Sequence, residues 1–193
     1  MKKIAFITSN QSKFNEVRDY FKNSNIEIIS IDHIIKVQDL PELQSFDAKE
    51  VIKHKLKQAI EHYEYLGEHL LVEDTSLYMD ALYGFPGPYA KSFLKQAKTD
   101  GVVSIAEKLE NNKASATTHI GYYNQHEVFY FEGTATGRLV KSTFRLNQGF
   151  EDIFIPDTDL ITFSEMISSH GIAYKNKHSM RGKALENMKV NLK

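Results

Sequence analysis

Two periods of hydrophobicity alternate along the first half of the chain. Short apolar runs at residues 2–7, 26–31 and 69–73 are typical of buried strands. Between them, apolar residues recur at helical spacing and predict amphipathic helices over about residues 12–22 and 46–66. The order strand, helix, strand, helix, strand favours an α/β sheet with crossover connections.

The second half has a different texture. Two short helical patterns, around residues 89–98 and 102–110, precede two segments rich in β-branched and aromatic residues. These segments, 115–123 and 126–140, meet at "NQ" and predict a hairpin. A short strand and a terminal helix are expected at residues 152–156 and 180–188. We therefore predict an α/β fold with a mixed sheet, in which an α/β lobe and a more antiparallel lobe enclose a cleft within a single domain.

Composition narrows the possible functions. The chain has 193 residues, no cysteine and a formal net charge of −1. The lack of cysteine excludes disulfides, thiolate metal ligands and cysteine nucleophiles. A net charge near zero offers no global attraction for nucleic acid or an anionic membrane, so neither partner is expected. The apolar run at residues 4–7 is too short for a signal peptide or a membrane span, and we expect a cytoplasmic protein.

Polar residues cluster where the first strand meets the first helix. Thr8, Ser9 and Asn10 could bind an anion together with the N–H groups at the helix start, and Lys13 adds a full charge. The alternative is an ordinary N-cap at Ser9, Asn10 or Ser12. The segment lacks the glycines of a P-loop.

Lys55 lies on the apolar stripe of the longest predicted helix. A lysine in such a place usually extends to the rim of the stripe, where water solvates its charge. If the stripe faces the floor of a cleft, Lys55 would instead direct its charge at a ligand.

Carboxylates end the third predicted strand. Glu73 and Asp74 stand where open α/β sheets bind ligands, and Glu42 lies in another loop. Oxygen ligands without thiols suit Mg²⁺, and a carboxylate can also take a proton from an attacking water. The alternative is that these acids pair or cap at the surface. The glycines and prolines of residues 84–88 would hold the next loop rigid beside them.

Two segments near the C-terminus offer further candidates. Lys175, Ser179 and Arg181 could grip an anion or a purine edge, or could simply begin a basic, capped helix. Phe150, followed by Glu151, could stack on a base or pack in the core.

Five motifs, in order along nearly the whole chain, resemble those of the inosine triphosphate pyrophosphatase family. They are "TSNQSK", "LPE", "VEDTSLYMDALYGFPGPYAKSFL", "FEGTATGRLV" and "KNKHSMRGKAL". The resemblance implies a two-lobed α/β fold with a central active-site cleft, a homodimer, and Mg²⁺-dependent hydrolysis of nucleoside triphosphates to monophosphate and pyrophosphate. The family's substrates are the inosine, deoxyinosine and xanthosine triphosphates.

The resemblance also implies a role for each matched residue. The phosphates would lie on Thr8, Ser9, Asn10, Lys13 and Lys55. The metal would lie on Glu42, Glu73 and Asp74, with Asp74 activating water. The base would lie among Phe150, Glu151, Lys175, Ser179, Met180 and Arg181.

Departures from the family pattern gather at the base end. Ser9 replaces a loop glycine, residues 148–152 replace an aromatic-Gly-aromatic-Asp-Pro run, and Met180 replaces a histidine. These changes leave base selectivity open, so the same reaction on another base is one alternative. A nucleotide-binding module without turnover is another, although the retention of Asp74, Glu42, Lys13 and Lys55 argues against it.

Overall fold

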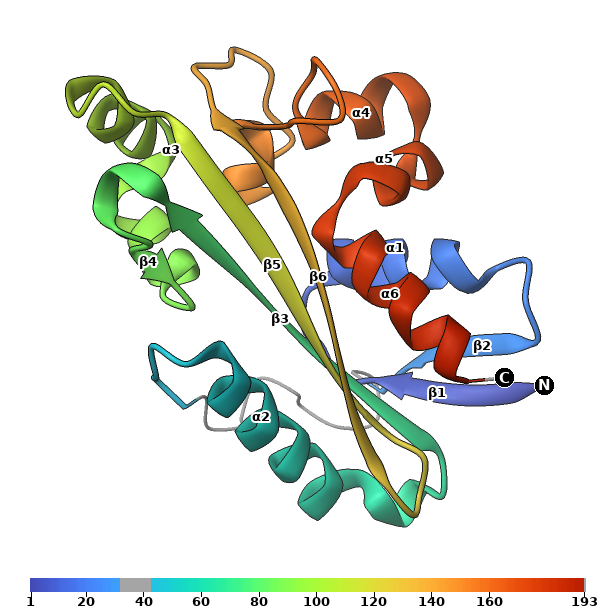
Figure 1. Ribbon diagram of the computed structural model, residues 1–193. Coiled ribbons are helices and arrows are strands. Elements are labelled where there is room, and N and C mark those ends of the chain that lie inside the picture. Colours follow the sequence, from blue (N-terminus) through green and yellow to red (C-terminus); the bar gives the residue numbers. More distant parts are fainter. Residues whose placement is uncertain (32–42, 193) are drawn as a thin grey trace.

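The computed structural model describes residues 1–31 and 43–192 (Figure 1). The first half contains the predicted strands and helices, and their bounds lie within a few residues of the expected ones except at the end of the third strand. They are β1 (Lys2–Phe6), α1 (Gln11–Phe21), β2 (Ile26–Ser30), α2 (Ala48–Tyr63), the 3₁₀ turn η2 (Glu64–Leu66) and β3 (His69–Met79).

The second half contains the predicted hairpin and terminal helix. After η3 (Asp80–Leu82) and β4 (Pro86–Gly87), α3 (Ala90–Lys108) joins the two predicted helices across a kink at Lys98. The later elements are β5 (Lys113–Tyr123), β6 (Val128–Leu139), η4 (Gly149–Asp152), β7 (Phe154–Pro156), α4 (Phe163–His170), α5 (Ile172–His178) and α6 (Met180–Asn191).

The seven strands among the described residues form one mixed sheet. Its order is β2-β1-β3-β5-β6-β7, with β4 paired to β3. β1 is parallel to both β2 and β3, whereas the remaining pairs are antiparallel. Figure 1 shows β3, β5 and β6 running the length of the molecule, with α3 and α4 at one end and β1, β2 and α2 at the other. The predicted α/β fold with two lobes is confirmed.

One predicted boundary is wrong, and it matters for the site. β3 does not stop at Glu73 and Asp74 but continues to Met79, because β5 pairs with it as far as Ala114. β1, however, pairs only with residues 69–71 of β3. The two acids therefore lie in mid-strand, just beyond the carboxyl end of the parallel part of the sheet.

Helices cover both faces of the sheet. Ala5 and Ile7 of the first strand and its extension face α2, and join a core with Leu56. Ile4 and Phe6 point the other way because side chains alternate along a strand, and they pack with α1 and α6. A third core, at the far end of β3, β5 and β6, includes residues of α3 and α4.

Glycines bring α6 very close to β6. A Cβ placed on Gly133 would lie 2.3 Å from backbone atoms of both Met180 and Ala184. A Cβ on Gly182 would lie 1.6 Å from the carbonyl oxygen of Asn176. The "FEGTATGRLV" motif thus has a packing reason, since Gly133 admits the helix that carries Arg181.

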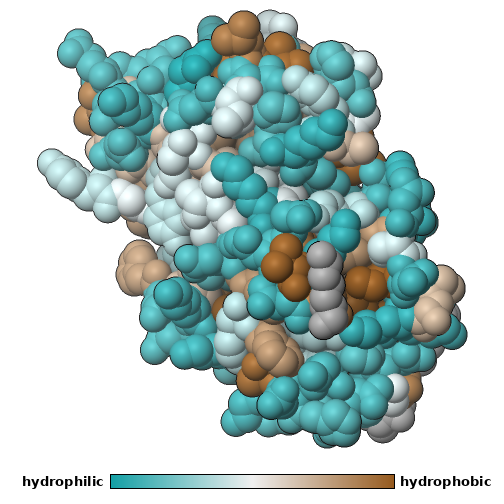
Figure 2. Space-filling model, turned by 45° about the vertical axis from the view of Figure 1, so that its right-hand side comes forward, coloured by the Kyte–Doolittle hydropathy of each residue, from teal (hydrophilic) through white to brown (hydrophobic). Residues whose placement is uncertain are grey.

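The molecular surface in Figure 2 is mainly hydrophilic, with hydrophobic side chains in small separate groups. None of the helices in the described part of the chain combines the length and hydropathy needed to cross a membrane.

Candidate active site

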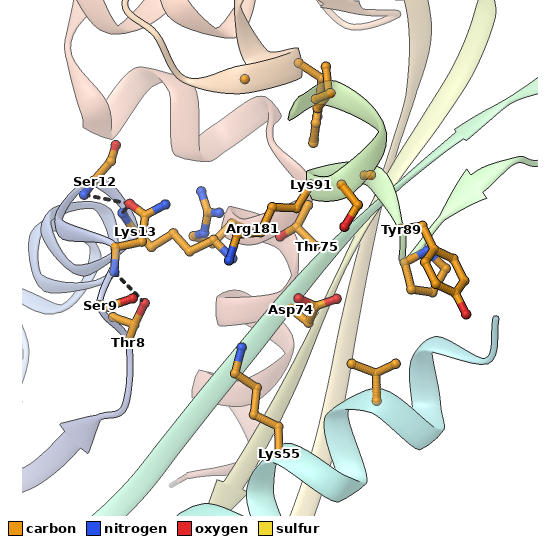
Figure 3. A pocket seen from close by; sticks show the side chains of 18 of the residues that line it. Thr8, Ser9, Ser12, Lys13, Lys55, Asp74, Thr75, Tyr89, Lys91 and Arg181 are labelled. Carbon is orange, nitrogen blue, oxygen red and sulfur yellow. Dashed lines mark hydrogen bonds between the residues drawn. The ribbon is translucent and has the colours of Figure 1, made fainter. Parts of the chain in front are cut away.

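A cavity of about 800 Å³ opens between the two lobes. Its wall comes from the β1–α1 turn, the helices α1 and α2, the middle of β3, the start of α3, residues 147–151, and Arg181 of α6. Figure 3 shows labelled side chains from all four of these helices around Asp74. Several of the segments that the sequence analysis connected with a ligand therefore meet in one place.

The β1–α1 turn forms one side of the cavity. Asn10 caps α1, since its Oδ1 accepts hydrogen bonds from the backbone N–H groups of Ser12 at 3.0 Å and Lys13 at 3.1 Å. Its own N–H donates to Thr8 Oγ1 at 3.1 Å. The cap and the anion site are thus not exclusive alternatives, because the capped end of α1 lines the cavity with its positive pole.

Lys55 reaches the cavity from α2. Its Nζ donates to the backbone oxygen of Glu73 at 3.0 Å, and its side chain contributes to the cavity wall. Figure 3 shows it rising from the helix toward Asp74. Of the two alternatives for Lys55, the structure thus has the one in which its side chain faces the cavity.

Glu73 and Asp74 point to opposite sides of β3. Asp74 lines the cavity, whereas Glu73 is 3% exposed and bonded to Lys13 at 2.5 Å and to Arg181 at 2.6 Å. Burial alone would raise the pKa of Glu73. The charges of Arg181 and Lys13, with their hydrogen bonds, outweigh burial and hold that pKa well below its usual range.

Arg181 extends this pair into a buried network. Glu16 Oε2 accepts from Lys175 Nζ at 2.5 Å and from Arg181 Nη1 at 2.6 Å. Glu151 Oε1 accepts from the same two cations, at 3.0 Å and 3.5 Å. With Glu73 and Lys13, three carboxylates meet three cations, so the buried charges balance.

The two inner acids respond differently to this environment. Burial raises the pKa of Glu151, and the nearby negative charge of Glu16 adds to that effect. Glu16 is also buried, yet Arg181 and Lys175 bond to it directly and lower its pKa. Glu151 Oε2 is buried and has no hydrogen-bond partner among the described residues. Glu151 as a residue contributes to the cavity wall.

Three of the expected base-site residues do not line the cavity. Lys175 is fully buried beneath the wall, where it bonds Glu16 and Glu151. Ser179 caps α6 by accepting from the N–H of Gly182 at 3.1 Å. Met180 has no exposed surface and packs in the core with side chains of the far lobe.

Nearly all the remaining candidate residues line the cavity. Phe150, Glu151 and Arg181 line the cavity, as do Thr8, Ser9, Asn10, Lys13, Lys55 and Asp74. Glu42 lies outside the described residues. Among the described residues no group of three or more potential metal ligands is brought together.

Sequence reasoning missed two charged residues of the wall, Glu16 and Lys91. Glu16 stands between Phe14 and Val17 on the buried stripe of α1, the same signal that drew attention to Lys55. Lys91 follows directly on the rigid 84–88 turn, in the first turn of α3. A charge on an apolar stripe and a cation next to a rigid turn were the available signals.

Comparison with known proteins places this geometry in a family. The model of the Ham1 family matches residues 4–191. A "dITP/XTP pyrophosphatase" of Pyrococcus horikoshii is 32% identical over 196 residues, covering 99% of each chain. An "Inosine triphosphate pyrophosphatase" of Saccharomyces cerevisiae is 34% identical over 96% of this chain and 93% of its own. The Ham1 protein of Staphylococcus aureus has the same fold, with a TM-score of 0.76 at 24% identity over 99% of this chain and 98% of its own.

Proposed function

Because this chain belongs to the Ham1 family, we propose that it hydrolyses non-standard purine nucleoside triphosphates to the monophosphate and pyrophosphate. Its relatives are named pyrophosphatases of dITP, XTP and inosine triphosphate. The observation that carries the proposal is the cavity, where cationic side chains from four helices surround Asp74 at the edge of the parallel strands.

The triphosphate lies along the cationic side of the cavity. The N-terminal end of α1 offers the positive pole of its helix dipole, and Lys13, Lys55 and Lys91 add charge from three helices. Thr8 and Ser9 add hydroxyl groups. A polyanion with about four charges requires such a local cluster, because the chain as a whole has a net charge of −1.

Asp74 and Glu42 are the residues we assign to Mg²⁺. Carboxylate and hydroxyl oxygens form the donor set that Mg²⁺ prefers, and Asp74 shares the cavity wall with the hydroxyl groups of Ser9 and Thr75. When bound, the ion would neutralise the phosphates and polarise the bond that breaks. Glu73 contributes indirectly, because its two oxygens hold Lys13 and Arg181 in position.

The reaction is an attack of water on the α-phosphorus. A new P–O bond forms, the α–β anhydride bond breaks, and pyrophosphate leaves with the electrons of that bond. Asp74 takes the proton of the attacking water, since it is the carboxylate of the β3 pair that faces the cavity. The surrounding cations stabilise the charge that develops in the transition state.

The base lies between Phe150, Glu151 and Arg181. A 6-oxopurine presents an acceptor at O6 and a donor at N1, whereas adenine presents the reverse. Arg181 supplies donors, and the unpartnered Glu151 oxygen accepts from N1–H, which stabilises the ionised carboxylate. Adenine would leave the Glu151 oxygen without a donor and would turn its own amino donor toward Arg181, so the site favours the oxopurine.

The test is pyrophosphate release from a panel of inosine, deoxyinosine, xanthosine, guanosine and adenosine triphosphates, with Mg²⁺ and with excess chelator. We expect turnover of the first three, weak turnover of adenosine triphosphate, and loss of activity with chelator. Release of orthophosphate alone, or full activity in chelator, would contradict the proposal. A homodimer and a cytoplasmic location remain part of the proposal, to be tested by sedimentation and by cell fractionation.

A further inference from the structure

One cavity-lining segment is held by a residue that does not itself line the cavity. Residues 147–151 form part of the cavity wall, but residues 140–148 have no helix or strand to satisfy their backbone groups. Backbone N–H groups in such a segment need partners from elsewhere. Asn147 and Gly149 also have positive φ angles of 60° and 67°, so the chain bends sharply on both sides of Gln148.

Asp152 supplies the missing partners. Its Oδ1 accepts from the N–H groups of Leu146 at 3.0 Å and Gln148 at 3.4 Å. The same oxygen accepts from the hydroxyl of Ser164, in the first turn of α4, at 2.6 Å. Asp152 is 2% exposed and Ser164 is fully buried, so water does not compete for these bonds.

A second tie joins the same segment to α3. Arg145 donates to the backbone oxygen of Asp152 at 3.4 Å and to the Asp100 carboxylate at 2.8 Å. The segment is therefore fastened to two helices of the far lobe. A proline, which the family pattern has at position 152, could make none of the side-chain bonds of Asp152.

We propose that Asp152 is a positioning residue for substrate binding, which anchors residues 147–151 to α4 through Ser164 and so sets the place of Phe150 and Glu151 against the base. The proposal rests on the proposed function, because it assumes that the base occupies this end of the cavity. Asp152 does not touch the substrate. It acts through the segment it holds, and its effect falls on the base and not on the phosphates.

The experiment compares Asp152→Ala, Asp152→Asn and Ser164→Ala with wild type, and uses Asp157→Ala, an exposed carboxylate nearby, as control. For Asp152→Ala we expect the KM for inosine triphosphate to rise about tenfold, with kcat changed less than about threefold. Inhibition by inorganic tripolyphosphate, which has no base, should stay within about twofold of wild type. Asp152→Asn keeps the acceptor oxygen and should recover most of the affinity.

Two outcomes overturn the proposal. One is an unchanged KM in Asp152→Ala. The other is an equal loss of affinity for inosine triphosphate and tripolyphosphate, which indicates a general structural defect. If Asp152→Ala does not fold, Ser164→Ala carries the test, with an expected rise in KM of about threefold.

Hydrogen exchange separates failure of this proposal from failure of the proposed function. The amides of Leu146 and Gln148 should lose protection in Asp152→Ala and keep it in Asp152→Asn, whether or not the protein turns over any nucleotide. Unchanged protection in Asp152→Ala overturns the anchor. Absence of pyrophosphate release in wild type, with protection lost as expected, overturns only the proposed function.

Discussion

Glu73 and Asp74 are neighbours in the chain, yet their side chains leave β3 on opposite sides. Glu73 joins a buried network with Lys13 and Arg181, and Asp74 faces the cavity. One residue thus holds Lys13 and Arg181 in position, while the next is open to the cavity. The alternation of side chains along an extended strand is the physical cause.

Replacement of Asp74 by asparagine tests whether its carboxylate acts as the general base. We expect kcat for inosine triphosphate to fall by about two orders of magnitude or more, the usual contribution of a positioned general base. The melting temperature should change little, because the two side chains have nearly the same shape. Asp80→Asn, an exposed acid just after β3, is the control. A rate close to that of wild type would indicate that another carboxylate is the general base.

Replacement of Lys55 by methionine tests phosphate binding. The substitution keeps most of the side-chain length but removes the charge, so we expect KM to rise by about tenfold or more, with a smaller change in kcat. Lys53→Met, at an exposed position on the same helix, should leave both constants unchanged. Equal KM values for Lys55→Met and Lys53→Met would contradict a role of Lys55 in phosphate binding.

A substitution at Met180 tests whether this buried side chain contacts the nucleotide base. Leucine has a similar volume and no donor, so Met180→Leu should preserve packing and leave the inosine-to-adenosine ratio of kcat/KM within about twofold of wild type. The ratio should fall in Arg181→Lys, which removes the guanidinium. A large change of this kcat/KM ratio in Met180→Leu would indicate that the side chain does contact the nucleotide base.

At the scale of elements, the approach of α6 to β6 is what brings Arg181 into the cavity. Gly133→Ala would place a Cβ 2.3 Å from the α6 backbone, so helix and strand must separate. We expect a loss of about 3 kcal/mol in the free energy of unfolding, the upper range for overpacking. Gly101→Ala, in α3, meets only an ordinary contact at 3.5 Å and should be neutral or stabilising. Chemical denaturation of both variants is the measurement.

For the whole molecule, the buried network ties together elements from both lobes. Lys13 and Glu16 come from α1, Glu73 from β3, and Glu151 from the segment before β7. The remaining cations, Lys175 and Arg181, lie on α5 and α6. A change in one of these charges should therefore alter global stability and not only the site.

Glu73→Gln tests this coupling through its pH dependence. The pKa of Glu73 is lowered in the folded protein, so its contribution is fully present above its ordinary pKa of 4.5 and is lost as pH falls toward the lowered value. At pH 7 we expect the variant to be less stable by about 3–5 kcal/mol, as for other broken buried pairs. The difference should shrink below pH 4.5. Glu107→Gln, on the exposed face of α3, should show no such difference at any pH.

Local patterns in the sequence were sufficient for most of the framework. Period-two and helical spacing located β1, α1, β2, α2 and the β5–β6 hairpin, because burial of one face dictates the spacing of apolar residues. Turn residues, caps and isolated charges on apolar stripes indicated Asn10, Lys55 and Asp74. α4 was missed, although its capping box, Thr162 with Glu165, was a readable signal.

Only the tertiary structure decided which charged residues face the cavity and which belong to the buried network. Glu16 and Arg181 are 165 positions apart and bond through the packing of two helices, which no local pattern encodes. Likewise, β3 passes Asp74 because β5 pairs with it, and Met180 enters the core because Gly133 admits α6. The sequence by itself supplied a set of candidate residues for nucleotide binding. Long-range strand pairing and helix packing decided which of them face the cavity and which lie beneath it.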